Sequence, residues 1–359
     1  MATIKEQTEK TEQLKTTLDN KVNSIGNIIN TKIKEKPTTL TQVEDALKRK
    51  MLGIGDIVTD LQIEDLGIPT DNNKTFTGHT GSVSYLVEDD DYIYSSSGSI
   101  GDNTIRKIRK TDMAEVGRYT LGTNTLQGLT IDSDYVYSGG TDDAIKKIRK
   151  SDMIEVGKFT YSRYSITALA NDNEYIYSGG GDNIIRKIRK SDMTEVGKLE
   201  GRMGTIHALI QDDEYVYSGS NDATVRKIEK TSMTVVSATG GYAYYVYALT
   251  QDNSYIYRNG KNNTVEKIKK VDMNKASSFN GHTSEVHALT QDYYFIYSGD
   301  KANIIKKIKK DDMREVYTFT GHTDIVNTLT IDENYIYSGA NDSTVRKWGK
   351  DRQYKILHI

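Results

Sequence analysis

The sequence predicts an all-β seven-bladed β-propeller preceded by an N-terminal α-helical stalk, and three observations support this fold class. A unit of forty residues recurs through most of the chain. The only two prolines, Pro37 and Pro69, precede the repeats and mark segment boundaries. The segment before Pro37 carries a regular apolar stripe. We therefore expect a long helix over 1–36, a helical neck or connector over 37–74 and the propeller over 75–359.

The apolar stripe of the first segment predicts an oligomerising coiled coil. Its residues recur at eleven-residue intervals, which keeps the seam nearly straight along one helix face. The other faces are polar, so the helix needs partner helices, most simply copies of itself, and a trimer is favoured. A single amphipathic helix lying on its own domain is the alternative. The seam residues are Leu14, Leu18, Val22, Ile25, Ile29 and Ile33.

The neck contains one recognisable helix signal. Thr41 and Glu44 have the spacing of a capping box, and Val43, Leu47 and Met51 would then share one face of a helix. We expect this segment to be a neck or docking element between the stalk and the repeats.

Each repeat is identified by a Tyr-x-Tyr-Ser phrase. The first interval between copies is 43 residues and the next five are 40 residues each. Four short strand-like runs in each copy are separated by turns rich in Gly, Asn and Asp, which predicts a four-stranded antiparallel sheet. Seven such sheets bury both faces when they stack radially into a closed ring. The phrases begin at Tyr92, Tyr135, Tyr175, Tyr215, Tyr255, Phe295 and Tyr335.

The composition argues against several classes of function. The net charge is −2 with balanced acids and bases, whereas a protein that binds nucleic acid or an anionic membrane would show a basic excess. No apolar run is long enough to span a bilayer, so no membrane insertion is expected. The chain contains no cysteine and therefore no disulfide, thiolate metal ligand or cysteine nucleophile. Its polar N-terminus lacks a secretory signal, so any extracellular role would need another route of export.

Several motifs resemble those of WD-repeat β-propellers over residues 75–359. They are “FTGHT” at 76–80 and 319–323, “FNGHT” at 279–283 and “SGSNDATVRK” at 218–227. The resemblance implies a structural hydrogen-bonded tetrad of His, Ser, Asp and Trp. Only the last copy matches it fully, while isoleucine replaces Trp in the other six, where paired tyrosines are expected to fill the volume. The matching residues are His322, Ser338, Asp342 and Trp348.

Either end of the repeat region could supply the strand that closes the ring. The last copy extends to Ile359, so its own C-terminal segment “QYKILHI” can form its fourth strand, and we favour this closure. Residues 74–77 are the alternative, an interlocked closure that is common in WD-repeat propellers.

No catalytic site, cofactor or metal site is expected, and the protein is predicted not to be an enzyme. The turn aspartate recurs from copy to copy, whereas a catalytic acid is needed only once. His207 and His287 hold equivalent positions two copies apart with Tyr247 between them, but no acid cluster supports a metal site there. No phosphate-binding loop or nucleophile motif occurs. The lysines and arginines of the third strand alternate with acids of the first turn, which predicts a solvated, self-complementary charged rim.

Differences among the seven copies predict one binding surface. The loop into the first strand is Gly-His-Thr in copies one, six and seven, but it becomes aromatic and basic in copies three to five. Copy five also changes its next turn, and both loops open on the same end of a propeller. Tyr and Arg are typical of recognition hot spots, while neutral drift is the alternative. The predicted patch contains Arg163, Tyr164, Arg202, Met203, Tyr242, Tyr244, Tyr245, Arg258 and Lys261.

A self-associating rod, a neck and a rigid head suit a multivalent attachment protein. The segment “TTLTQVEDALKRKMLGIGDIVTDLQIEDL” resembles the base-docking part of fibres from bacteriophages or phage-tail-like particles. This resemblance implies a receptor-binding protein at the tail tip of a virion or particle, docked to a baseplate or tail protein. Its propeller would bind a glycan or protein on the host surface. The alternative is an intracellular WD-repeat scaffold for protein–protein interaction.

Overall fold

The computed structural model describes residues 62–65, 74–98, 101–121, 125–161, 164–201, 204–240, 244–350 and 354–357. The chain forms two compact units, one from Leu66–Gln353 and the other from Met1–Asp65 with Tyr354–Ile359. In the second unit, β1 (Gln62–Asp65) pairs antiparallel with β30 (Tyr354–Leu357). The predicted coiled-coil stalk, its seam residues and the predicted neck helix lie outside the described residues.

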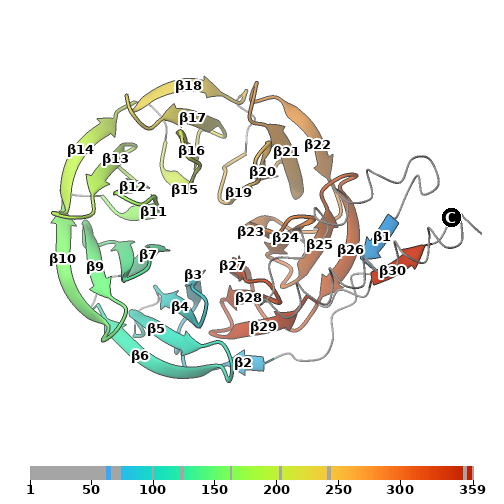
Figure 1. Cartoon of the computed structure of the whole chain (residues 1–359), viewed down its shortest axis with the longest axis horizontal. Coiled ribbons are helices and arrows are strands. Elements are labelled where there is room, and N and C mark those ends of the chain that lie inside the picture. Colours follow the sequence, from blue (N-terminus) through green and yellow to red (C-terminus); the bar gives the residue numbers. More distant parts are fainter. Residues whose placement is uncertain are drawn as a thin grey trace, which may run out of the picture. The chain divides into compact units, whose positions relative to one another are not determined.

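The larger unit is a ring of seven four-stranded antiparallel sheets, which confirms the predicted seven-bladed propeller (Figure 1). The innermost strands are β3 (Val83–Glu88), β7 (Leu126–Ile131), β11 (Ile166–Asn171), β15 (Ile206–Gln211), β19 (Leu249–Gln251), β23 (Val286–Gln291) and β27 (Val326–Ile331). The second strands are β4 (Tyr92–Ser97), β8 (Tyr135–Gly140), β12 (Tyr175–Gly180), β16 (Tyr215–Ser220), β20 (Tyr255–Gly260), β24 (Phe295–Asp300) and β28 (Tyr335–Ala340).

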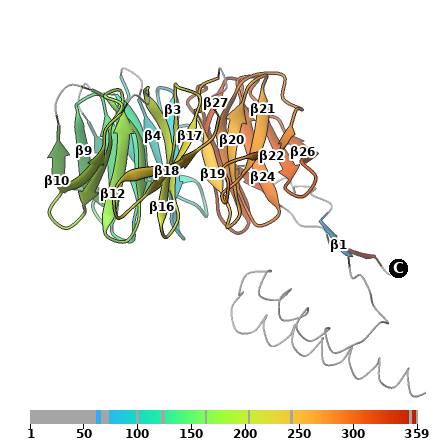
Figure 2. The ribbon, with the colours of Figure 1, turned by 90° about the horizontal axis from the view of Figure 1, so that it is seen from above.

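The third strands are β5 (Thr104–Arg109), β9 (Ala144–Arg149), β13 (Ile185–Arg189), β17 (Val225–Glu229), β21 (Thr264–Lys269), β25 (Ile305–Lys309) and β29 (Val345–Gly349). The outer strands are β6 (Ala114–Thr120), β10 (Ile154–Thr160), β14 (Thr194–Leu199), β18 (Thr234–Ala238), β22 (Lys275–Phe279), β26 (Arg314–Phe319) and β2 (Lys74–Phe76). Viewed edge-on, the strands run through the thickness of the ring (Figure 2).

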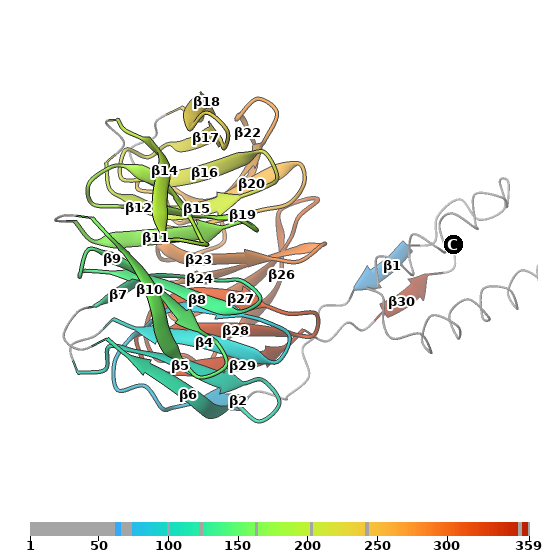
Figure 3. The ribbon, with the colours of Figure 1, turned by 60° about the vertical axis from the view of Figure 1, so that its left-hand side comes forward.

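The ring is closed by β2 and not by the C-terminal segment, so the favoured closure was wrong. β2 pairs with β29 and places Phe76 opposite Val345, in the register that Phe319 has opposite Ile305 one blade earlier. Phe76 is only 8% exposed and packs in the cluster that joins blade seven to blade one. The β2 strand itself lies beside β29 (Figure 3). The C-terminal segment pairs with β1 instead. The N-terminal strand thus fills the same position that Tyr119, Phe159, Leu199, Phe279 and Phe319 fill in their own blades, and that Thr239 fills in blade four.

Apolar clusters lie between neighbouring blades rather than in one central core. The Ser-Gly phrase of the second strand explains how closely the blades approach. A Cβ atom added to Gly339 of blade seven would lie 2.4 Å from Cγ1 of Val83 in blade one. Gly219 meets Val246 of the next blade at the same distance. At these positions glycine is required because a β-branched side chain of the next blade occupies the place of a Cβ atom. Blades one and five instead carry Ser96 and Asn259 at the equivalent position.

A network of tyrosine, aspartate and lysine also ties each blade to the next. In blade two, Asp132 accepts hydrogen bonds from the backbone N–H of Tyr135 and the hydroxyl of Tyr137, both at 2.8 Å. Lys190 of blade three forms an ion pair with the same carboxylate at 3.0 Å. Tyr137 is fully buried, and the Lys190 ammonium lies 5.4 Å from its ring centre. The paired tyrosines therefore pack between the blades and also anchor charged groups.

This arrangement recurs at all seven blade interfaces and closes on itself. The expected complementarity of third-strand lysines and first-turn acids is present, but the expectation of a solvated rim was wrong, because most of these lysines are buried and the pairs bridge neighbouring blades. The pairs are Lys150–Asp89, Lys190–Asp132, Lys230–Asp172, Lys270–Asp212, Lys310–Asp252, Lys350–Asp292 and Lys110–Asp332.

We expect the propeller to lose stability steeply when the pH falls below about 4. Burial alone would raise the pKa of Asp132, but hydrogen bonds from Lys190, Tyr137 and the Tyr135 backbone outweigh it and lower this pKa. The other six aspartates of the network also have lowered pKa values. A carboxylate whose pKa is lower in the folded state stabilises it above the unfolded pKa, and this stabilisation is lost as the pH falls through the folded pKa.

Thermal unfolding followed by circular dichroism between pH 3 and pH 8 checks this expectation. Burial also lowers the pKa values of His79, His207, His287 and His322, so a shallower loss should begin near pH 6.5, where the unfolded chain takes up protons first. The variant Lys190→Met should show a smaller loss of stability below pH 4 than the native chain. An unfolding midpoint that stays constant down to pH 3 would contradict the role of the aspartates.

Candidate functional site

One end of the ring, here called the loop face, carries the loops into the innermost strands and the turns between second and third strands. The network of tyrosine, aspartate and lysine lies at the opposite end, because successive turns of an antiparallel sheet alternate between its ends. The loop face holds the predicted tetrad and, of the predicted patch, the described residues Tyr164, Tyr244, Tyr245 and Lys261.

In blade seven, the four tetrad residues form one hydrogen-bonded chain. The Trp348 indole N–H donates to Oγ of Ser338 at 2.7 Å, and this hydroxyl contacts Nε2 of His322 at 2.6 Å. Nδ1 of His322 lies 2.8 Å from Oδ2 of Asp342. Burial lowers the pKa of His322 despite the nearby carboxylate. A neutral imidazole that donates from Nδ1 satisfies every member, which fits a structural role.

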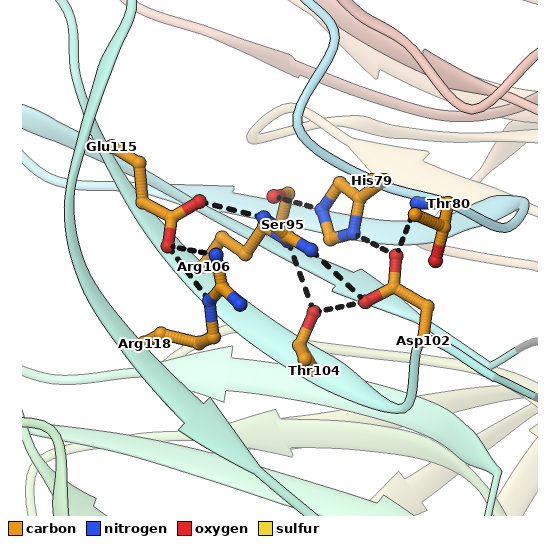
Figure 4. Close-up of polar contacts among 8 residues, drawn as sticks. All are labelled: His79, Thr80, Ser95, Asp102, Thr104, Arg106, Glu115 and Arg118. Carbon is orange, nitrogen blue, oxygen red and sulfur yellow. Dashed lines mark hydrogen bonds and ion pairs between the residues drawn. The ribbon is translucent and has the colours of Figure 1, made fainter.

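Blades one and six keep the His-Ser-Asp part of this chain without Trp. In blade one, His79 contacts Asp102 at 2.8 Å and Ser95 at 2.7 Å, and Arg106 links the aspartate to Glu115 (Figure 4). In blade six, the carboxylate comes from Asp300, which contacts His282 at 2.8 Å. In blade six, Ala302 holds the position of Asp342, and Asp300 lies two residues before it. A carboxylate from a different backbone position therefore binds the histidine.

The described members of the predicted patch differ in exposure. Tyr164 and Tyr245 are 54% and 49% exposed, Lys261 is exposed and Tyr244 is partly buried. The remaining loop residues of the patch lie outside the described residues: Arg163, Arg202, Met203 and Tyr242.

Arg258 does not belong to an exposed patch, because its side chain is buried inside blade five. Only 2% of it is exposed, and its Nε donates to Oε2 of Glu266 at 2.8 Å. Its Nη1 donates to the carbonyl of Ala223 in blade four at 2.9 Å. In the other blades a serine holds the position of Arg258 and an arginine or lysine holds that of Glu266. In blade five, the basic residue therefore stands on the second strand, and an acidic residue replaces it on the third strand.

The neighbouring Asn259 has a role that the sequence comparison did not identify. Its Oδ1 accepts hydrogen bonds from the backbone N–H of Tyr247 at 2.8 Å and of Ala248 at 3.1 Å. Its Nδ2 donates to the carbonyl of Tyr245 at 2.9 Å. Asn259 thus fixes the backbone of the aromatic loop of blade five and positions both tyrosines. Its signal was the replacement of the Ser-Gly phrase by Arg-Asn in this copy alone.

The tyrosine loop leads directly to a column of aromatic rings at the axis of the propeller. Tyr245 packs edge-to-face on Tyr247, with ring centres 6.0 Å apart and planes at 88°. Tyr247 lies between His207 of blade four, at 5.1 Å, and His287 of blade six, at 5.0 Å. The pair with His287 is nearly parallel, at 22°. These rings support one another and give the exposed Tyr245 a rigid base.

Glu285 connects the loops of blades five and six beside this column. Its carboxylate lies 3.3 Å from Nε2 of His287 and forms an ion pair with Lys301. Burial together with a hydrogen bond to Glu285 raises the pKa of Tyr244. Burial lowers the pKa of His287 although Glu285 opposes this shift. At neutral pH the imidazole is therefore uncharged, and the Glu285 charge is balanced by Lys301.

The axial cavity is a second feature that the sequence comparison missed. It has a volume of about 400 Å³ and is lined by one equivalent residue of every blade, at or just before the inner strand, together with Tyr85, Leu126 and Asn341. Each of the seven equivalent residues follows a buried aliphatic residue, and its identity changes from blade to blade, which is the signal that was available in the sequence. The seven residues are Ser84, Gln127, Thr167, His207, Tyr247, His287 and Asn327. No group of three His, Asp or Glu suited to a metal ion occurs in the described parts of the chain.

Sequence and structure comparisons place this domain in a known class. The WD domain, G-beta repeat family matches residues 71–107 and 313–349, which belong to the first and the last blades. The WD40 beta propeller domain of Doa1 superimposes with a TM-score of 0.70 at 17% identity, over 79% of this chain and 98% of that one. The computationally designed Ika8 protein gives 0.62 at 20% identity, over 77% and 98%. No curated protein sequence matches the chain.

Closure by β2, the intact tetrad of blade seven and these matches define the larger unit as a seven-bladed β-propeller. Its first and last blades match the WD-repeat family, and its fold is similar to that of a WD40 propeller. Propellers of this class are typically non-enzymatic domains of protein interaction. Across the ranges that the structure describes, no helix is long and apolar enough to cross a membrane.

Proposed function

We propose that this protein is a non-enzymatic recognition protein that binds a protein partner on the loop face of blades four to six. One observation carries the proposal: the exposed Tyr245 rests on Tyr247, which is itself held between His207 and His287. An exposed aromatic side chain on a rigid base loses little entropy when it binds, which is typical of hot spots. Asn259 strengthens this arrangement because it fixes the loop backbone before any partner arrives.

A finer form of the proposal makes the partner a receptor on a host cell, with the protein carried at the tail tip of a phage or phage-tail-like particle. It is supported by the sequence layout of stalk, neck and head and by the resemblance of the N-terminal segment. The comparisons name no tail protein, and of the N-terminal segments that support this form the structure describes only β1, Gln62–Asp65. The coarser form, an interaction scaffold, follows from the WD-repeat class itself.

The variant Tyr245→Ala is expected to weaken partner binding at least tenfold, which is about 1.4 kcal/mol. For the receptor form, binding is measured as retention of the protein on intact bacterial cell walls. For the scaffold form, the partner is first identified by cross-linking and purified, and its affinity for each variant is then measured by titration. Tyr293→Ala is the matched control, because Tyr293 is similarly exposed, at 61%, but lies on the opposite face. Equal binding by the native chain and Tyr245→Ala, with a loss for Tyr293→Ala, would refute the assigned surface.

A further inference from the structure

The axial cavity has features of a small-molecule site that the recognition of a protein partner does not explain. Its volume of about 400 Å³ falls in the range of known ligand pockets, roughly 300–1,000 Å³. All seven blades contribute to its wall. The contributing position is polar in every blade but differs in every neighbouring pair, although the ring needs no such variety for closure. The side chain at this axial position differs between neighbouring blades although the fold does not require it. We take this variation as a sign that the lining is adapted to the shape of one ligand.

The lining offers hydrogen bonds but no charge. Its polar groups are hydroxyls, amides, imidazoles and phenols, and no carboxylate, ammonium or guanidinium belongs to the lining. Burial lowers the pKa values of His207 and His287, so both imidazoles are neutral at pH 7. The nearest carboxylate, Glu285, is balanced by Lys301, so a charged ligand would lose its hydration here without gaining an unpaired counter-charge. A neutral ligand with several hydroxyls would exchange its hydrogen bonds to water for bonds to the wall.

Two groups on opposite sides of the axis are prepared for such a ligand. The ring of Tyr247 is clamped between two imidazoles, so the position of its hydroxyl is fixed. Across the cavity, Oε1 of Gln127 is buried and accepts no hydrogen bond within the described residues. This oxygen can therefore accept a hydrogen bond from a ligand without first losing one to the protein. Groups that need no rearrangement before binding improve affinity.

We infer that the axial cavity binds a neutral carbohydrate of one or two sugar rings. Such a ligand carries the many uncharged donors and acceptors that match the lining, and the cavity volume suits a small molecule rather than a folded segment. The cavity shares His207, Tyr247 and His287 with the base of the exposed Tyr245, but a ligand in it would contact the lining at the axis and not Tyr245 itself. The inference therefore does not depend on which protein partner binds the loop face.

Saturation-transfer NMR on the full chain tests this inference, with glucose, galactose, mannose, N-acetylglucosamine and their β-linked disaccharides as probes. We expect at least one neutral probe to bind, and its charged analogues, a uronic acid or an amino sugar, to bind at least tenfold more weakly. Tyr247→Phe keeps the ring stack and removes only the hydroxyl, and Gln127→Met removes the amide at similar size. Each should weaken the binding of that probe at least tenfold, while Tyr293→Phe leaves it unchanged.

Three outcomes would overturn the inference. The first is that no probe binds at about 50 mM, since an ordered site should have a lower dissociation constant. The others are that charged analogues bind as well as neutral ones, or that both cavity variants bind like the native chain. Circular dichroism of each variant separates a loss of binding from a loss of fold. Protein-partner binding of Tyr247→Phe is measured in parallel, so failure of the carbohydrate site and failure of the loop-face proposal give different results.

Discussion

Removal of residues 1–77 is expected to destroy the closed propeller. This truncation deletes β2, which completes blade seven by pairing with β29 and places Phe76 against Val345. It also exposes the apolar cluster between blades seven and one, which contains Val83, Leu86 and Tyr337. Loss of one buried phenylalanine alone costs about 3–5 kcal/mol, a large share of the roughly 5–15 kcal/mol that stabilises a typical domain. The truncated chain should show no cooperative thermal transition by circular dichroism.

Two further chains make the result specific to the closing strand. Removal of residues 351–359 deletes β30, which pairs with β1 and not with blade seven, so this chain should unfold near the native midpoint. The point variant Phe76→Ala tests the same contact without a truncation and should lower the midpoint strongly, while Phe76→Leu should retain much of the stability. If the protein stays folded after the N-terminal truncation but unfolds after the C-terminal truncation, the C-terminal segment and not β2 closes the ring.

The closing strand also shows where sequence reasoning stops. Every blade must bury the same faces, so the forty-residue period predicts the number of blades and the four strands of each. The strand that fills the last position is different, because both ends of the chain offer an apolar residue in the correct phase. Phe76 and Ile359 each fall where Phe319 stands one repeat earlier. The choice between them depends on tertiary contacts, and a pattern within one repeat contains no information about them.

The candidate site shows a similar limit. The loss of Gly-His-Thr in blades three to five correctly directed attention to the loops, and Tyr164 and Tyr245 are exposed there. An arginine that replaces a serine in a turn-proximal strand also looks like a binding residue, yet Arg258 points into the blade. Its partner Glu266 is on the paired strand, opposite Arg258 in register. Only a comparison of both positions together across the copies would have revealed the exchange.

This exchange gives the second large prediction, because Arg258 and Glu266 form a buried ion pair. Arg258→Ser is expected to destabilise the propeller by about 3 kcal/mol, since it leaves the Glu266 carboxylate buried with only the half-exposed Lys275 as a partner. The variant Arg149→Ala is the matched control. Arg149 pairs with Asp152 at the surface, and loss of such a pair costs about 1 kcal/mol or less. Urea unfolding at pH 7 measures both changes.

The double variant Arg258→Ser, Glu266→Arg distinguishes the buried pair from a simple loss of packing. It restores the serine and the basic residue that the other blades carry at these positions, so it should recover at least half of the lost stability. The pH supplies a second test. Burial alone would raise the pKa of Glu266, but Arg258 and Lys275 outweigh it and lower this pKa in the native chain.

Without Arg258 the balance at Glu266 reverses, and burial should raise its folded pKa above the unfolded value. A carboxyl group in that state is destabilised increasingly as the pH rises through its folded pKa, so the cost of Arg258→Ser should be largest at pH 7 and smaller near pH 4. A cost that is the same at both pH values would show that Arg258 acts through its packing and its hydrogen bond to Ala223 rather than through its charge.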